Sequence, residues 1–269
     1  MRKIIFTLLL ASSLTVSCQE KENKGNFTFS GSVDTYYSSN LSKNSLGTVG
    51  VLSDVPANGF GLGMANTIFS YEKGKVGVVA DLAYGPRANA YTGTVNQLYV
   101  YYKSSEKVTF TLGQFNTFFR YKVISPVGNF NYSVSYLFNA GPFSHTGLKV
   151  DYAASDDLSF MLAVTNPHTI TTGSNPTHDY QLGFQTGYKG QFLNLVYGAV
   201  TQVGATDYLF LDYASGFSLS ESFFFGINAA YSNSNNDEID YQSIALYLQN
   251  TFSNTFSLGL IPEFHKTTS

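Results

Sequence analysis

The sequence has no tryptophan, one cysteine and few charged residues, which make up 12% of its 269 positions. Its single cysteine, Cys18, cannot form a disulfide framework within the chain. A charged fraction at about half the usual share is too small for the surface of an ordinary soluble domain. Hydrophobic residues nevertheless reach 43%, with 23 Phe and 20 Tyr, so we do not expect a disordered chain.

A long hydrophobic run is also missing. A membrane-spanning helix needs ~20 apolar residues, and no stretch approaches that length. The nearest candidate, Ile4 to Ala11, follows Arg2 and Lys3 and has the pattern of an export signal. We therefore expect residues 1–18 to form a signal peptide and the mature chain to span residues 19–269.

Two processing routes fit the end of this signal. Val16-Ser17-Cys18 suits ordinary signal peptidase, which would leave Gln19 as the first mature residue. Alternatively, Cys18 becomes a lipidated first residue. A lipidation signal normally has Leu three residues before the cysteine, whereas this chain has Thr15, which favours ordinary cleavage.

The sequence shows neither the positive charge of a nucleic-acid-binding protein nor the residue spacing of a metal site. Without Arg2 and Lys3 the chain keeps 13 basic and 18 acidic residues, and a net charge of −5 does not attract nucleic acid. The histidines lack metal-ligand spacing with one another or with an acid. They are His145, His168, His178 and His265. We expect no enzyme activity, no cofactor and no metal site.

What the chain does have is alternation with a period of two, repeated in segment after segment from Asn26 onward. In residues 158–165, Leu, Phe, Leu and Val take the even positions, and Ser, Met, Ala and Thr take the odd positions. The bulky face suits contact with lipid, and the small polar residues of the opposite face suit a confined, hydrated lumen. The polar face of a soluble sandwich would carry more Lys and Glu.

Short and long connections between these segments strictly alternate along the chain. Residues 72–75 and 104–106 are short connections, whereas 38–58 and 116–144 are long ones. This pattern predicts an all-β transmembrane protein: an up-and-down antiparallel β-barrel of about 13–14 strands, with short periplasmic turns and long extracellular loops.

The longest break in the alternation, residues 116–144, is too apolar for a simple surface loop. We expect it to fold into the barrel and narrow the channel, with Arg120 and Lys122 facing the permeating solute. In the alternative interpretation it packs over the barrel mouth or partly extends the strands, and both charges lie in bulk water.

The same parity places a set of charged residues on the lumen face. They are Asp34, Asp81, Lys149, Asp151 and Asp212, with Arg87 just after the third strand. Such charges can tune ion selectivity. The simpler interpretation is that they pair with one another in a water-filled lumen.

Several stretches resemble the OmpL-like β-barrel porins of Gram-negative outer membranes. They are 81–88 (DLAYGPRA), 113–115 (GQF) with 121–124 (YKVI), 131–138 (NYSVSYLF), 141–143 (GPF) and 145–147 (HTG). The resemblance covers most of the mature chain. It implies a porin-like protein of the outer membrane that meets lipid on its outer face, without naming a solute. From the count of about 13–14 strands we expect a lumen that passes small hydrophilic solutes or ions. A plugged barrel used for structure or surface attachment, or less readily an outer-membrane barrel enzyme, is the alternative.

A final expectation concerns strand number. Thirteen strands would leave the last one, about residues 255–264, running outward like the first one. Bacterial single-chain barrels have an even strand number. We therefore expect the mature barrel of residues 19–269 to lack its last strand or strands, unless one strand within 116–144 escapes the count. Pro262 within the last strand is unusual because proline donates no ladder hydrogen bond.

Overall fold

The computed structural model describes residues 25–39, 48–49, 52–56, 58–119, 121–167, 175, 178–200, 208–234 and 240–267. One antiparallel sheet contains nearly all of its strands, each hydrogen-bonded to the next one in the sheet, except that the last two both pair with the strand before them. They are β1 (Asn26–Ser39), β4 (Asn58–Lys73), β5 (Val76–Tyr84), β6 (Val95–Lys103), β7 (Val108–Asn116), β8 (Ser144–Ala153), β9 (Leu158–Thr165), β10 (Gln181–Tyr188), β11 (Gln191–Gly198), β12 (Tyr208–Ser218), β13 (Phe223–Asn233), β14 (Tyr241–Ser253), β15 (Phe256–Leu260) and β16 (Glu263–Thr267). The expected all-β, up-and-down architecture is confirmed.

The last two strands, β15 and β16, are two halves of one strand. Both pair with β14 in a single register, with Leu260 opposite Leu248 and Glu263 opposite Ala245. Pro262 interrupts the strand because it has no N–H, but its carbonyl still accepts a hydrogen bond of 2.9 Å from the Leu246 N–H. The sheet therefore contains fourteen strands by hydrogen bonding, of which the last two occupy one position.

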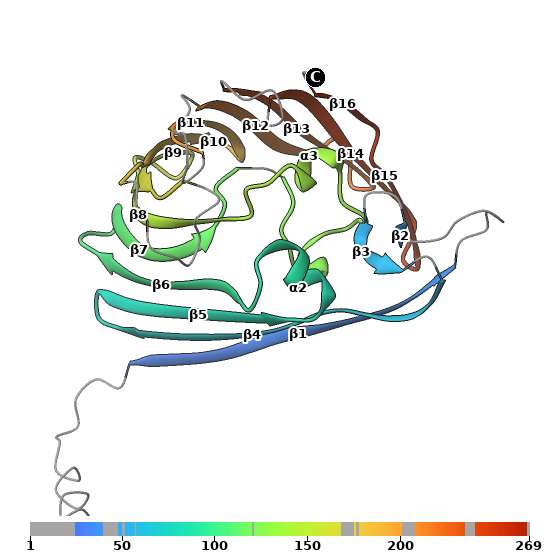
Figure 1. The fold of residues 1–269 in the computed structure, drawn as a ribbon, viewed down its shortest axis with the longest axis horizontal. Helices are drawn as coiled ribbons and strands as arrows, with labels where there is room; N and C mark the ends of the chain where they lie inside the picture. Colours follow the sequence, from blue (N-terminus) through green and yellow to red (C-terminus); the bar gives the residue numbers. More distant parts are fainter. Residues whose placement is uncertain are drawn as a thin grey trace, which may run out of the picture.

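The sheet curls around an interior, with β1 and β15–β16 as its two edges (Figure 1). Among the described residues, no ladder joins β1 to β15 or β16. That further strands complete the barrel stays a prediction. A two-stranded hairpin, β2 (Thr48–Val49) and β3 (Leu52–Pro56), lies in the connection between β1 and β4.

The connections alternate in length as predicted. Tight turns such as Gly74-Lys75 and Lys189-Gly190 lie at one end of the sheet, and the long connections between β7 and β8 and between β9 and β10 start from the other end. Three short helices occur in the long connections: α2 (Pro86–Tyr91), the 3-10 helix η1 (Pro126–Gly128) and α3 (Tyr136–Asn139). No helix in the described part of the chain is long and apolar enough to cross a membrane.

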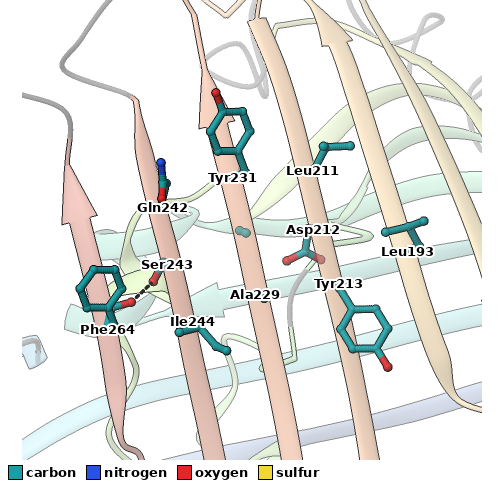
Figure 2. Close-up of a pocket in the computed structure, with 11 residues that line it drawn as sticks. Leu193, Leu211, Asp212, Tyr213, Ala229, Tyr231, Gln242, Ser243, Ile244 and Phe264 are labelled. Carbon is teal, nitrogen blue, oxygen red and sulfur yellow. Dashed lines mark hydrogen bonds between the residues drawn. The ribbon is translucent and has the colours of Figure 1, made fainter.

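The outward face of the sheet is apolar and exposed. Phe29 and Leu162 each keep 62% of their surface accessible, although they lie in the middle of strands. A groove of about 390 Å³ crosses the outer face of β11–β14 and β16, between side chains such as Leu193, Leu211 and Phe264 (Figure 2). Such a face is stable when lipid chains cover it.

Candidate functional site

Residues 117–143, here called the inner segment, lie inside the ring of strands (Figure 1). Its Phe119 and Leu137 are buried in one apolar cluster with residues of β11–β14 and the connection after β11. The other members of that cluster are Val196, Val200, Tyr208, Phe210, Ala230, Tyr241, Ala245 and Tyr247. The segment was expected to fold into the barrel, and its packing agrees with that expectation.

A second apolar cluster joins the inner segment to the opposite wall. Ile124, Val134 and Phe138 pack there against Met64 of β4, together with Ala83 of β5 and Ala88 of α2. The inner segment thus contacts two walls that are far apart in the strand order, and it crosses the interior between them.

Glycines on the inner wall make room for aromatic rings of the inner segment. A β-carbon at Gly183 of β10 would lie 2.5 Å from the ring of Phe118. At Gly226 of β13, a β-carbon would lie 2.7 Å from the ring of Tyr121. Because real β-carbons do not approach other atoms so closely, only glycine permits these contacts.

The inner segment reaches far down the interior. Tyr121 stacks on Tyr247 of β14, with ring centroids 4.4 Å apart, and its centroid lies 6.2 Å from that of Phe224. Phe224 is the second residue of β13, next to the tight turn that precedes this strand. The segment therefore begins at the long-loop end and extends to the short-turn half of the sheet.

Polar contacts fix the segment to the last strand. The two carboxylate oxygens of Glu263 accept hydrogen bonds from the backbone N–H groups of Tyr136 and Leu137, each at 2.7 Å. Ser135 caps the same helix, since its Oγ accepts from the Phe138 N–H at 3.0 Å. The negative charge of this carboxylate also stabilises the N-terminus of α3, where the free N–H groups carry partial positive charge.

Arg87, one of the predicted lumen charges, performs a different task from that expected. It lies in α2 and is 0% exposed, so it does not face open solvent in the lumen. Its Nε donates to the Ile124 carbonyl at 2.9 Å, and its guanidinium lies 5.3 Å from the ring centroid of Tyr132. Arg87 therefore ties the inner segment to the wall on the side of β4 and β5.

Lys122 is buried within the inner segment. Its Nζ donates to the carbonyls of Asn131 and Ser133 at 2.7 and 2.5 Å, and only 5% of the residue is exposed. Its charge therefore does not lie in bulk water, and that it faces the permeating solute stays a prediction. Burial, with a smaller contribution from the Arg87 charge, lowers the pKa of Lys122 to about 8. Arg120 lies outside the described residues, so its part in the constriction stays a prediction.

Asp81 and Asp212 do face the interior, and each accepts hydrogen bonds from asparagine amides. Asp81 accepts from Asn66 Nδ2 at 3.1 Å and from Asn96 Nδ2 at 2.6 Å. In the same way, Asp212 accepts from Asn194 Nδ2 at 2.8 Å and from Asn228 Nδ2 at 2.5 Å. Each acid is thus held by one asparagine from each neighbouring strand.

The remaining predicted lumen charges are partly exposed. Asp34 accepts a hydrogen bond of 2.7 Å from the Tyr132 hydroxyl of the inner segment. Lys149 and Asp151 form an ion pair at 2.5 Å, as the pairing interpretation predicted. The side chains of Lys149 and Asp151 are 23% and 41% exposed to solvent.

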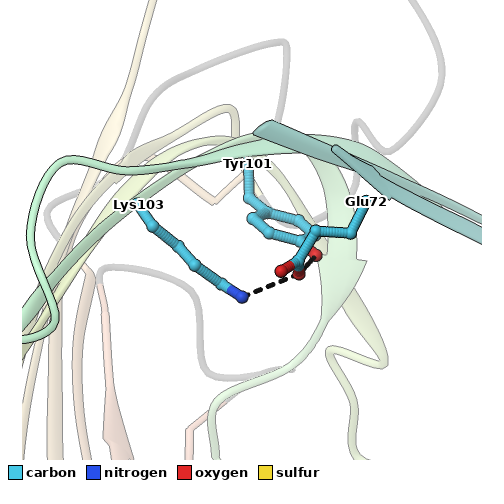
Figure 3. A network of polar contacts seen from close by, with 3 residues as sticks. All are labelled: Glu72, Tyr101 and Lys103. Atoms are coloured by element: carbon cyan, nitrogen blue, oxygen red, sulfur yellow. Dashed lines mark hydrogen bonds and ion pairs between the residues drawn. The ribbon is translucent and has the colours of Figure 1, made fainter. Parts of the chain in front are cut away.

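A further polar group lines the inner face near the short turns. Glu72 accepts hydrogen bonds from the Tyr101 hydroxyl and from Lys103 Nζ, the latter at 2.7 Å (Figure 3). Sequence analysis did not single out this group or Glu263. Period-two parity alone would have placed Glu72 and Lys103 on the lumen face.

Within the described residues, no three side chains among His, Cys, Asp and Glu gather where they could hold a metal ion. Cys18 lies outside those residues. His145 is buried beside the ring of Phe118, with centroids 4.6 Å apart, and contacts the Thr117 hydroxyl at 3.1 Å. This histidine belongs to the packing of the inner segment.

An antiparallel sheet with an apolar outer face, a polar interior and an inserted segment defines a β-barrel protein of the outer membrane. The chain belongs to the family described as "Putative beta-barrel porin-2, OmpL-like", whose model matches residues 26–268. The resemblance noted in the sequence is therefore confirmed, and the protein is an outer-membrane porin of this family.

Two solved porins are among the structures to which this chain is similar. A BenF-like porin from Pseudomonas fluorescens Pf-5 is 11% identical, with 91% of this chain and 68% of that chain covered and a TM-score of 0.43. OccD3 (OpdP) from Pseudomonas aeruginosa is 14% identical, with 93% and 59% covered and a TM-score of 0.40. No curated protein matches the chain.

Proposed function

We propose that the protein is a passive channel for small hydrophilic solutes, narrowed by the inner segment. The observation that carries this proposal is the uneven packing of that segment. Its apolar clusters involve β4, β5 and β11–β14. On the wall between them, Lys149 and Asp151 of β8 stay partly exposed. We infer that polar solutes pass along this wall, because its charged side chains are not covered by the inner segment.

The second candidate is a plugged barrel with a structural or attachment role. The complete burial of Leu137 at 0% exposure favours it, because a well-packed segment can also block the lumen. The two candidates differ in whether the native protein conducts ions, since only an open lumen supports a steady current.

Planar-bilayer recording of the purified protein separates these candidates. For a channel, we expect stepwise conductance from the native protein and larger steps from Leu137→Asp, which places a charge in the apolar cluster. A native protein that stays silent at several voltages, while Leu137→Asp conducts, would establish the plugged barrel. The control is Ser220→Asp, which places the same charge in an exposed short turn. A charge at Phe225 would not serve as a control, because Phe225 faces lipid.

A further inference from the structure

A cavity of about 380 Å³ separates the inner segment from β13 and β14. The residues that matter for its chemistry are Tyr121, Lys122, Phe130, Phe224, Tyr247 and Gln249. Phe224 follows the tight turn before β13, and Gln249 is its partner in the register of β14. The cavity therefore lies in the short-turn half of the interior.

Lys122 is the one charged residue among those that line this cavity. An ammonium group has three N–H donors, and two of them bond to the Asn131 and Ser133 carbonyls. No described carboxylate forms an ion pair with Lys122, and the inner segment contains no Asp or Glu. The ring of Tyr247, with its centroid 5.8 Å from Nζ, is the remaining neighbour of the ammonium group, so its positive charge is not neutralised by a carboxylate and remains for a ligand.

The rest of the lining is aromatic and amide-bearing. Tyr121 and Tyr247 lie face to face, with an interplanar angle of 17°, and Phe224 lies beside Tyr121. Rings next to a buried cation suit a ligand that has a charged end and an apolar body. Because Lys122 is the one cation that lines the cavity, its charge matches a monoanion better than a dianion.

We propose that this cavity binds a small organic monocarboxylate, with its carboxylate at Lys122 Nζ and its apolar body against Tyr121 and Phe224. This inference rests on the proposed channel function for the route by which the ligand arrives. It adds a chemical class of solute to the proposed channel, at a site beside β13 and β14 and not on the wall of β6–β9.

The absence of tryptophan provides a direct binding assay. A Phe130→Trp variant, at the edge of the cavity, is titrated with sodium butanoate in detergent at pH 7, and its fluorescence is recorded. We expect a saturable change with butanoate and none with butylammonium or butanol. Phe225→Trp, on the lipid-facing side of β13, is the matched control and is expected to give no saturable change.

Substitution of Lys122 tests the charge. In the Phe130→Trp background, Lys122→Met is expected to weaken butanoate binding at least tenfold, and Lys122→Arg is expected to retain it. Equal binding by Lys122→Met, or an equal response to butylammonium, would overturn the inference. If Lys122→Met does not fold, the comparison of butanoate with butylammonium decides alone.

Binding without bilayer conductance would refute the channel function and leave the binding site standing, whereas conductance without binding would refute the binding site.

Discussion

Gly226 lies directly against the ring of Tyr121, and a β-carbon at position 226 would approach the Tyr121 Cζ to 2.7 Å. Tyr121 also stacks on Tyr247, the cross-strand partner of Gly226, with ring centroids 4.4 Å apart. The ring therefore cannot retreat without breaking a second contact. A change at one glycine of the wall is transmitted to the whole lower part of the inner segment.

We expect Gly226→Val to loosen the inner segment. Overpacking typically costs about 1–3 kcal/mol, and the displaced segment should obstruct the lumen less. The variant should therefore lose its folded form at a lower temperature in heat-modifiable gel migration, and its conductance steps should be larger. Ala229→Val adds bulk on the lipid side of the same strand and is the control. Native behaviour of Gly226→Val would show that Tyr121 does not occupy this place.

Glu263→Ala removes the acceptor for two backbone N–H groups at the start of α3. Loss of a helix cap typically costs about 0.5–2 kcal/mol, so the segment should leave its docked position more often. We expect more current fluctuation in single-channel records and faster proteolysis within residues 126–140. Glu221→Ala, in an exposed short turn, should change neither measurement.

Arg87→Met should weaken the attachment of the inner segment to the wall on the side of β4 and β5. The substitution leaves the buried Ile124 carbonyl without its Nε donor, and an unsatisfied buried acceptor costs about 1–3 kcal/mol. Arg87→Lys should rescue only part of this loss, because a lysine lacks the planar guanidinium that lies near Tyr132. Thermal unfolding monitored by circular dichroism measures both variants. Equal stability of all three proteins would contradict the assigned contact.

The carboxylates of Asp81 and Asp212 should affect ion selectivity. Replacing Asp81 and Asp212 with Asn removes two negative charges from the inner wall, so cation permeability should fall relative to anion permeability. The reversal potential in a salt gradient measures this ratio. Asp156→Asn combined with Glu221→Gln removes the same charge from exposed short turns and should leave the ratio nearly unchanged.

Lys122 should make the channel sensitive to alkaline pH. Because its pKa is lowered to about 8, the side chain loses its charge as pH rises from 7 to 9, and selectivity should shift towards cations. Lys122→Arg should abolish this shift. The unfolded chain titrates near 10.5 and binds more protons between the two values, so the free energy of unfolding should rise over that interval. A reversal potential that is constant from pH 7 to 9 would exclude Lys122 from the conducting path.

Alternation and connection lengths were sufficient to predict the strands, because both are local properties of the sequence. The lumen face of Asp81, Asp212 and Lys149 followed from the same parity. The partners of these residues could not be predicted, since Asp212 meets Asn194 and Asn228 only through the pairing register. Arg87 was misjudged for a similar reason. Position along the chain placed it just after the third strand, but burial beneath the inner segment depends on contacts with residues 37 or more positions away.

The attachment of the inner segment to Glu263 has a consequence for biogenesis. The two groups are separated by more than 120 positions, so the N-terminus of α3 acquires its acceptor only after the last strand has paired with β14. Contacts between distant positions form late and slowly. A nascent protein in which β1–β13 have already assembled therefore still has an unanchored inner segment. Its permeation path is narrowed by the anchored segment only when β16 pairs with β14, so the pairing of this strand and the calibre of the channel are set in the same step.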